Sequence, residues 1–128
     1  MPQRLRRTRL IVAVVFALAA AACGGGAATG DVDKIQVALG QFDVTVTNAS
    51  GRALFEVRTE IEPVGPASHF GTTVARMENG EKASLVHSRF TDRDGIPFSP
   101  RGVRVKGVIV TAKDIDGKVF RVELPWKQ

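Results

Sequence analysis

Two short acidic segments are the first candidates for chemistry in this chain. Asp92-Arg93-Asp94-Gly95 and Asp114-Ile115-Asp116-Gly117 share the pattern DxDG, and closely spaced carboxylates are ligands that Ca²⁺ prefers. A calcium loop of the EF-hand kind needs more ligands at its fifth and twelfth positions, where neither segment has an oxygen-bearing side chain. A strand expected between them also puts the segments at opposite ends of the fold. We interpret both as turns, which Asp and Gly favour, and expect no metal ion and no cofactor.

The histidines offer two further kinds of site. His69, Met77 and His87 are residue types that bind copper(I), but their spacings of eight and ten residues match no known motif. Nucleophilic catalysis would need a serine beside a base. Ser84 and Ser88 lie an odd number of residues from His87, so on a strand they would point to the opposite face. We therefore expect no catalytic residues and no enzyme.

The segment from residue 89 to 104 has an unusual concentration of arginines. Its basic residues, Arg89, Arg93, Arg101 and Arg104, surround Phe98. One interpretation is a partner-binding loop over 91–102, in which Phe98 anchors a partner and Arg93, Arg101 and Arg104 pair with its acids. In the other, Phe98 folds back as a lid on the core, and Asp92 and Asp94 neutralise the arginines. The sequence leaves both open.

The charge of the chain is unevenly distributed. Its 128 residues contain 18 Lys and Arg against 13 Asp and Glu, a formal charge of +5. Four of the arginines lie in the first nine residues, so residues 23–128 are nearly neutral. A neutral domain lacks the basic surface that nucleic acids require. The apolar content of 44% and charged content of 24% fit one globular domain, and we expect no nucleic-acid partner.

The first 22 residues have the pattern of an export signal. A basic segment over 1–9 precedes 13 uncharged apolar residues, Leu10 to Ala22, too few to cross a bilayer, which takes about 20. The run ends Ala20-Ala21-Ala22-Cys23 and resembles a bacterial lipoprotein signal, although Ala20 stands where that family usually has Leu. The resemblance implies that the Cys23 thiol receives a diacylglycerol, that the leader is cut before it, and that the new amino terminus is acylated, for example with palmitate.

Two alternatives remain open at this position. Ordinary secretory cleavage after Ala22 would release a soluble protein, and an uncleaved leader would act as an anchor. Lipidation is favoured because Cys23 is the only cysteine, so it has no partner for an internal disulfide. Residues 24–30 contain no bulky side chain and indicate a flexible tether. We therefore predict a signal peptide over 1–22, a lipidated Cys23 with a tether over 23–31, and a domain over 32–128.

The domain shows short runs of β-branched and aromatic residues separated by turn residues. This pattern predicts an all-β fold, a single antiparallel sandwich of about seven strands. An Asn-Gly turn is expected over 78–81, and a change of phase predicts a β-bulge near Gly107. The expected strands cover 34–39, 42–47, 53–61, 69–77, 82–90, 103–113 and 119–126.

The alternation of apolar and polar residues predicts which side chains face the core. Predicted to face inward are Phe42, Val44, Val46, Phe55, Val57, Ile61, Phe120, Val122 and Leu124. Predicted to face outward are Thr45, Arg58, Glu60 and Arg121.

These strands resemble the immunoglobulin-like and fibronectin-like sandwiches of bacterial envelope proteins. The resemblance rests on 42–61, with its Thr47-Asn48-x-Ser50-Gly51 turn, and on the paired strands of 103–126. The antibody subgroup is excluded because its cysteine pair is absent and Trp126 is at the end of the chain. The resemblance implies an architecture and no specific activity.

The expected function is therefore that of a non-catalytic module on the periplasmic or outer face of a bacterial membrane. The membrane, through the lipid, and another envelope protein are the expected partners. The alternative is a small-ligand or carbohydrate-binding module, which exposed and coplanar Phe98 and Trp126 would favour.

Overall fold

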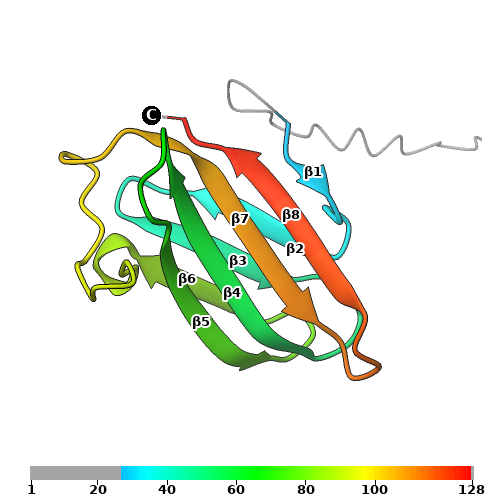
Figure 1. Ribbon diagram of the computed structural model, residues 1–128. Helices are drawn as coiled ribbons and strands as arrows, with labels where there is room; N and C mark the ends of the chain where they lie inside the picture. Colours follow the sequence, from blue (N-terminus) through cyan, green and yellow to red (C-terminus); the bar gives the residue numbers. More distant parts are fainter. Residues whose placement is uncertain (1–26, 128) are drawn as a thin grey trace, which may run out of the picture.

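The computed structural model describes residues 27–127, so the predicted signal peptide and Cys23 lie outside the described residues. The described chain is all-β, and two antiparallel sheets pack face to face (Figure 1). The predicted β-sandwich is confirmed. Its strands are β1 (Thr29–Gly30), β2 (Ile35–Leu39), β3 (Asp43–Asn48), β4 (Leu54–Pro63), β5 (Phe70–Met77), β6 (Lys82–Val86), β7 (Val105–Lys113) and β8 (Val119–Pro125), with one 3-10 turn, η1 (His87–Arg89), after β6.

One sheet has the order β1-β8-β7-β4-β5 and the other the order β2-β3-β6. Burial alternates regularly along β3, as the period of two requires, and irregularities interrupt the alternation in β4 and β7. Val44 and Val46 of β3 and Val108 and Val110 of β7 belong to the same core cluster, and all four are at most 1% exposed. The core therefore lies between the two sheets, and the hairpin turns lie at the two ends of the sandwich.

The larger sheet begins inside the range predicted as a tether. Thr29 and Gly30 pair with Glu123 and Val122 of β8. The backbone N–H of Asp31 donates to the carbonyl of Arg121 at 2.9 Å, which extends the pairing by one residue. The predicted boundary at residue 31 is therefore too late, because short polar residues can still form backbone ladder bonds.

The prediction that Phe42 faces the core is wrong, since its side chain is 71% exposed. Val44 and Val46 keep the predicted inward phase, but β3 begins only at Asp43. Phe42 lies in the turn from β2 to β3, where its carbonyl accepts the N–H of His87 at 2.9 Å. The period of two holds only along a strand, so it does not extend to this residue.

Phe55 is only partly buried, because β4 contains a β-bulge that the sequence pattern did not predict. Phe55 pairs with Lys113 of β7 and Arg58 with Thr111, so two residues of β4 stand opposite one of β7. Glu56, at the bulge, has a φ of 50°. The bulge changes the phase, so Leu54 is buried at 1% and Phe55 packs under the guanidinium of Arg76.

The bulge predicted near Gly107 is confirmed. Glu62 pairs with Gly107 and Pro63 with Val105, which leaves Lys106 as the extra residue. Gly107 is required there, because a Cβ would lie 2.7 Å from the carbonyl oxygen of Leu124.

A pair of phenylalanine substitutions tests this register. Phe120 is 5% exposed, Phe42 is 71% exposed, and truncation of a buried phenylalanine costs about 3–5 kcal/mol. We expect Phe120→Ala to lower the free energy of unfolding by that amount and Phe42→Ala to lower it by less than about 1 kcal/mol. Leu54→Ala should cost about 2–5 kcal/mol. Denaturant unfolding curves measure all three, and equal losses for the two phenylalanines would show that the register is wrong.

Candidate functional site

The loops at one end of the sandwich bring together several of the residues singled out in the sequence, among them Arg101 and Arg104. β2 joins β3 there, β4 ends at Pro63, β7 begins at Val105, and β8 ends at Pro125. We call this the loop end; it comprises residues 40–42, 64–69, 99–104 and 126–127. The opposite, turn end comprises residues 31–34, 49–53, 78–81 and 114–118.

Four aromatic rings close the core at the loop end. Phe98 packs edge-on against Phe70 at 5.4 Å and against His87 at 5.5 Å between ring centroids. Trp126 lies 5.9 Å from Phe98 and 5.6 Å from His87. Phe98 is only 4% exposed, so the structure has the lid that one interpretation required. A side chain this deeply buried does not anchor a partner, and the prediction of Phe98 as an anchor is corrected.

His87 is the buried titratable group of this cluster. Its Nε2 atom is shielded from solvent and has no hydrogen-bond partner among residues 27–127. Burial lowers the pKa of His87 below its usual range, and the nearby charge of Asp43 only partly opposes this effect. His87 is therefore a neutral packing residue between Phe98 and Trp126.

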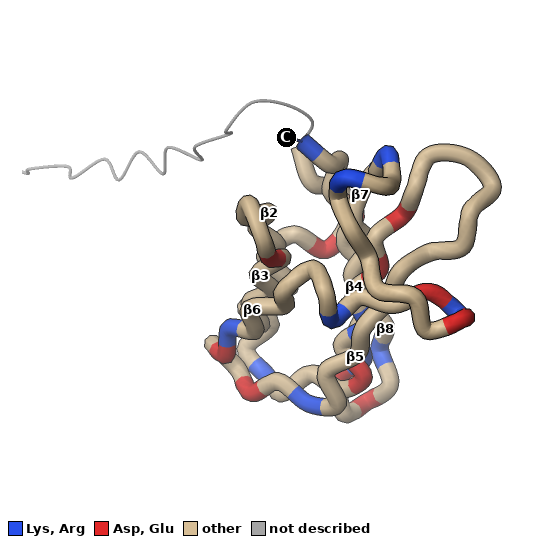
Figure 2. Tube along the Cα trace, turned by 90° about the vertical axis from the view of Figure 1, so that its left-hand side faces the viewer, with Lys and Arg blue, Asp and Glu red and all other residues tan. Residues whose placement is uncertain are grey.

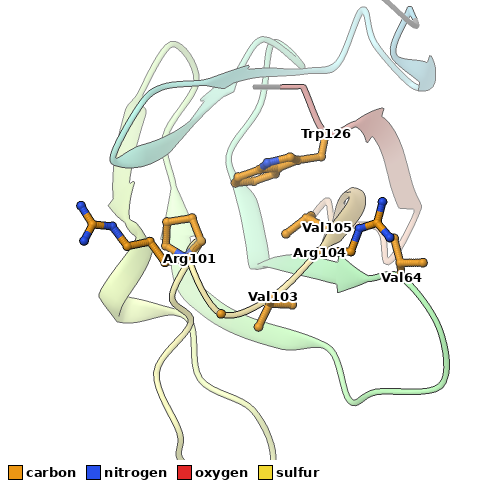
Figure 3. Close-up of a pocket in the computed structure, with 8 residues that line it drawn as sticks. Val64, Arg101, Val103, Arg104, Val105 and Trp126 are labelled. Carbon is orange, nitrogen blue, oxygen red and sulfur yellow. The ribbon is translucent and has the colours of Figure 1, made fainter.

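A pocket of about 450 Å³ lies between Trp126 and the chain that leads into β7. Its apolar wall consists of Trp126, Val64, Val103 and Val105, and Arg101 and Arg104 supply its charge. The two arginines project to opposite sides of the segment that lines the pocket (Figure 3). The sequence suggested Trp126 as an exposed sugar platform only in the alternative function; its position directly after β8 places it at this end of the sandwich.

Ion pairing divides the arginines of the described chain into two groups. Those outside the 89–104 segment each contact a carboxylate: the pairs are Arg52–Asp116, Arg58–Glu60, Arg76–Glu78 and Arg121–Glu123. Those inside it, Arg89, Arg93, Arg101 and Arg104, form no ion pair with any residue from 27 to 127. The structure therefore leaves a local excess of positive charge around the loop.

The prediction that Asp92 and Asp94 neutralise these arginines is wrong. Oδ1 of Asp92 accepts the backbone N–H groups of Asp94 and Ile96, both at 2.9 Å. Asp92 therefore stabilises its own turn. It forms no ion pair with Arg93 or Arg101.

Both DxDG segments are turns, as predicted. Oδ1 of Asp114 accepts the N–H groups of Asp116 and Lys118 at 2.9 Å, which is the same arrangement as at Asp92. The segment from 114 to 117 lies at the turn end beside Arg52, whose guanidinium is 2.7 Å from Asp116.

The structure does not bring together the residues considered for copper binding. His69 Nδ1 lies 3.1 Å from a carboxylate oxygen of Glu60, Met77 is completely buried at the far end of β5, and His87 is in the aromatic cluster. In the described part of the chain, no group of three or more His, Cys, Asp or Glu side chains is arranged to hold a metal ion.

The serines near His87 have other contacts or none. Ser84 donates its hydroxyl to Asp43 across the β3–β6 pair, and Ser88 is exposed. Residues 27–127 contain no helix long and apolar enough to cross a membrane.

Titration of His87 gives a test of the aromatic cluster. Because burial lowers its pKa in the folded state, the unfolded chain, with a histidine pKa of about 6.5, binds more protons below that pH. We expect the free energy of unfolding to fall as the pH is lowered from 7 to 5. The slope should become flatter in His87→Leu and persist in His69→Leu, measured by denaturant unfolding at each pH. A slope that follows His69 would contradict the assignment.

No protein-family model, no curated protein and no solved structure matches the chain. The function therefore has to be argued from the residues and their geometry.

Proposed function

We propose that this chain is a lipid-anchored, non-catalytic interaction module of a bacterial cell envelope, and that the loop end is its binding surface. The anchor is supported by the apolar run Leu10–Ala22 followed directly by Cys23. The domain is held close to that anchor, because Ala28 already packs against the core.

The strand order supports an immunoglobulin-like type of sandwich. If β2 to β8 are named A, B, C, C′, E, F and G, the sheets become ABE and GFCC′. Immunoglobulin domains have A, B and E in one sheet and G, F and C in the other, and C′ is added beside C in some of them. The edge strand β1 lies outside this scheme, on the free side of G.

The observation that best supports a binding function is the set of unpaired arginines. Arg101 and Arg104 are exposed beside a partly apolar pocket, and neither forms an ion pair with a carboxylate of residues 27–127. Arginine beside an aromatic ring is common where proteins bind partners, and a guanidinium binds carboxylate or phosphate with two parallel hydrogen bonds. The partner of this surface therefore carries negative charge.

The positions of the histidine and serine side chains considered for catalysis support a function in binding rather than catalysis. The buried histidine, His87, packs against Phe98 and Trp126 and makes no hydrogen bond to Ser84 or Ser88. Catalysis by a serine requires such a contact or one that can form.

The carbohydrate-binding alternative has less support. A sugar platform needs exposed, roughly coplanar aromatic rings. Phe98 is buried, and its ring makes an angle of 76° with that of Trp126.

Metabolic labelling tests the anchor. After growth with a labelled fatty acid, the wild-type protein should carry the label and remain with the membrane fraction, because two or three acyl chains hold a protein firmly. Cys23→Ser should lose the label, and Ala20→Leu, which restores the usual lipobox leucine, should keep it. An unlabelled wild type in the soluble fraction would disprove lipidation.

Photo-crosslinking in living cells tests the binding surface. A photoreactive residue at Ser99, on the loop end, should give adducts with an envelope lipid or protein. The same residue at Lys82, an exposed position near the turn end, serves as the control and should give few adducts. Equal yields at the two positions would disprove the assignment of the loop end as the binding surface.

A further inference from the structure

The two ends of the sandwich differ in charge. The residues that define the loop end include three basic ones, Arg101, Arg104 and Lys127, and no acidic one, and the adjoining segment 87–98 has two residues of each sign. The turn end contains six acidic residues and three basic ones. Figure 2 shows the basic positions near the carboxyl terminus and a mixture of both signs at the opposite end. The domain therefore has an electric polarity along its strands.

The described chain begins at the basic end. β1 runs antiparallel to β8, with Thr29 opposite Glu123. Ala27 consequently lies beside Lys106 and Pro125, with which it lines one hollow of the surface. Pro125 directly precedes Trp126 at the loop end, so the part of the chain that precedes Ala27 joins the domain near this end (Figure 1).

The distance from this point to the anchor is short. Four residue steps separate Cys23 from Ala27, and an extended chain covers at most about 15 Å in four steps. A lipid on Cys23 would therefore hold Ala27 within about that distance of the headgroups, which is at most about two Debye lengths, since one is about 8–10 Å in physiological salt. The basic residues of the loop end would also be attracted to an anionic membrane, which favours an orientation with the loop end toward the bilayer.

We propose that the loop end binds the anionic phospholipid headgroups of the membrane that holds the anchor. Arg101, Arg104 and Lys127 contact the lipid phosphates, and the exposed apolar side chains Phe42 and Val64, at 71% and 57% exposure, lie at the interface. This inference rests on the proposed function, since it names the partner of the same surface. A headgroup layer fits better than an acidic protein because the short connection leaves little room for a partner between the loop end and the bilayer.

The single tryptophan of the chain, Trp126, is a reporter at this surface. The full-length protein, purified from membranes, is reconstituted into phosphatidylcholine vesicles with and without phosphatidylglycerol. Both vesicle types contain a lipid with a nitroxide quencher on its headgroup. We expect at least about twofold stronger quenching of Trp126 in the anionic vesicles, and we expect 1 M salt to remove the difference, because it shortens the Debye length to about 3 Å.

Paired charge reversals provide the control. R101E/R104E should abolish the difference between the two vesicle types without unfolding the protein, because both arginines are exposed and neither contributes to an ion pair in the described structure. K82E/K118E changes the net charge by the same amount at positions at or near the turn end. Neither lysine forms an ion pair with a described residue, and we expect this variant to leave the quenching unchanged. The experiment with 1 M salt uses the wild-type protein, so the test does not require that any variant fold.

The outcomes separate this inference from the proposed anchor. Equal quenching in the two vesicle types, or an equal effect of both double variants, would overturn the inference even if the protein floats with every vesicle. Flotation only with anionic vesicles, sensitive to salt and to R101E/R104E, would support the inference and disprove the anchor. A crosslink from Ser99 to one protein, together with no effect of phosphatidylglycerol, would assign the loop end to a protein partner and overturn the inference.

Discussion

The open ends of a two-layer sandwich are the constraint on which this structure depends. Two sheets cover each other's inner faces, but at each end the core would meet water unless loops close it. At the loop end Phe98, His87 and Trp126 pack against one another for this purpose. At the turn end Asn48, only 1% exposed, donates to the carbonyls of Arg52 and Met77 at 2.7 and 3.0 Å. One end is closed by apolar packing and the other by hydrogen bonds.

This closure explains why the proposed binding residues are arginines rather than aromatic residues. A domain of about 100 residues has few aromatic side chains, and burial of one contributes a substantial part of a marginal stability. Phe98 is therefore buried in the core and Trp126 packs against it, which leaves the guanidinium groups of Arg101 and Arg104 as the exposed charged groups of the loop. Exposed charges that lack partners contribute little to folding, so their positions are free to serve binding.

The sequence predicted the regular parts of the strands well, but it predicted their starting points and one of their bulges poorly, for a physical reason. Alternation reports burial while the strand is regular, so Val44, Val46 and Gly107 were placed correctly. It does not report where a strand begins, which is why Phe42 was placed in the core. It also does not report a bulge without a glycine, which is why Phe55 was preferred to Leu54. Three of the paired arginines lie two residues before a glutamate, a pattern that the sequence contains, but the pair of Arg52 with Asp116 joins distant residues and could be recognised only in the structure.

In the proposed arrangement, the lipid on Cys23 and the charges of the loop end together orient the domain on the membrane. A lipid fixes the distance of a domain from the bilayer but not its rotation, whereas charges fix rotation only when the domain is already near the surface, because salt screens them beyond about 10 Å. Neither is sufficient alone: single weak membrane contacts are reversible, and two combined signals give stable attachment. In this chain the four residue steps from Cys23 to Ala27 cover at most about 15 Å, so the proposed lipid would keep Ala27 within about two Debye lengths of the headgroups, where part of the attraction remains. A longer tether would make the charges of Arg101 and Lys127 ineffective, so the proposed orientation requires that the sheet begin as early as β1 does.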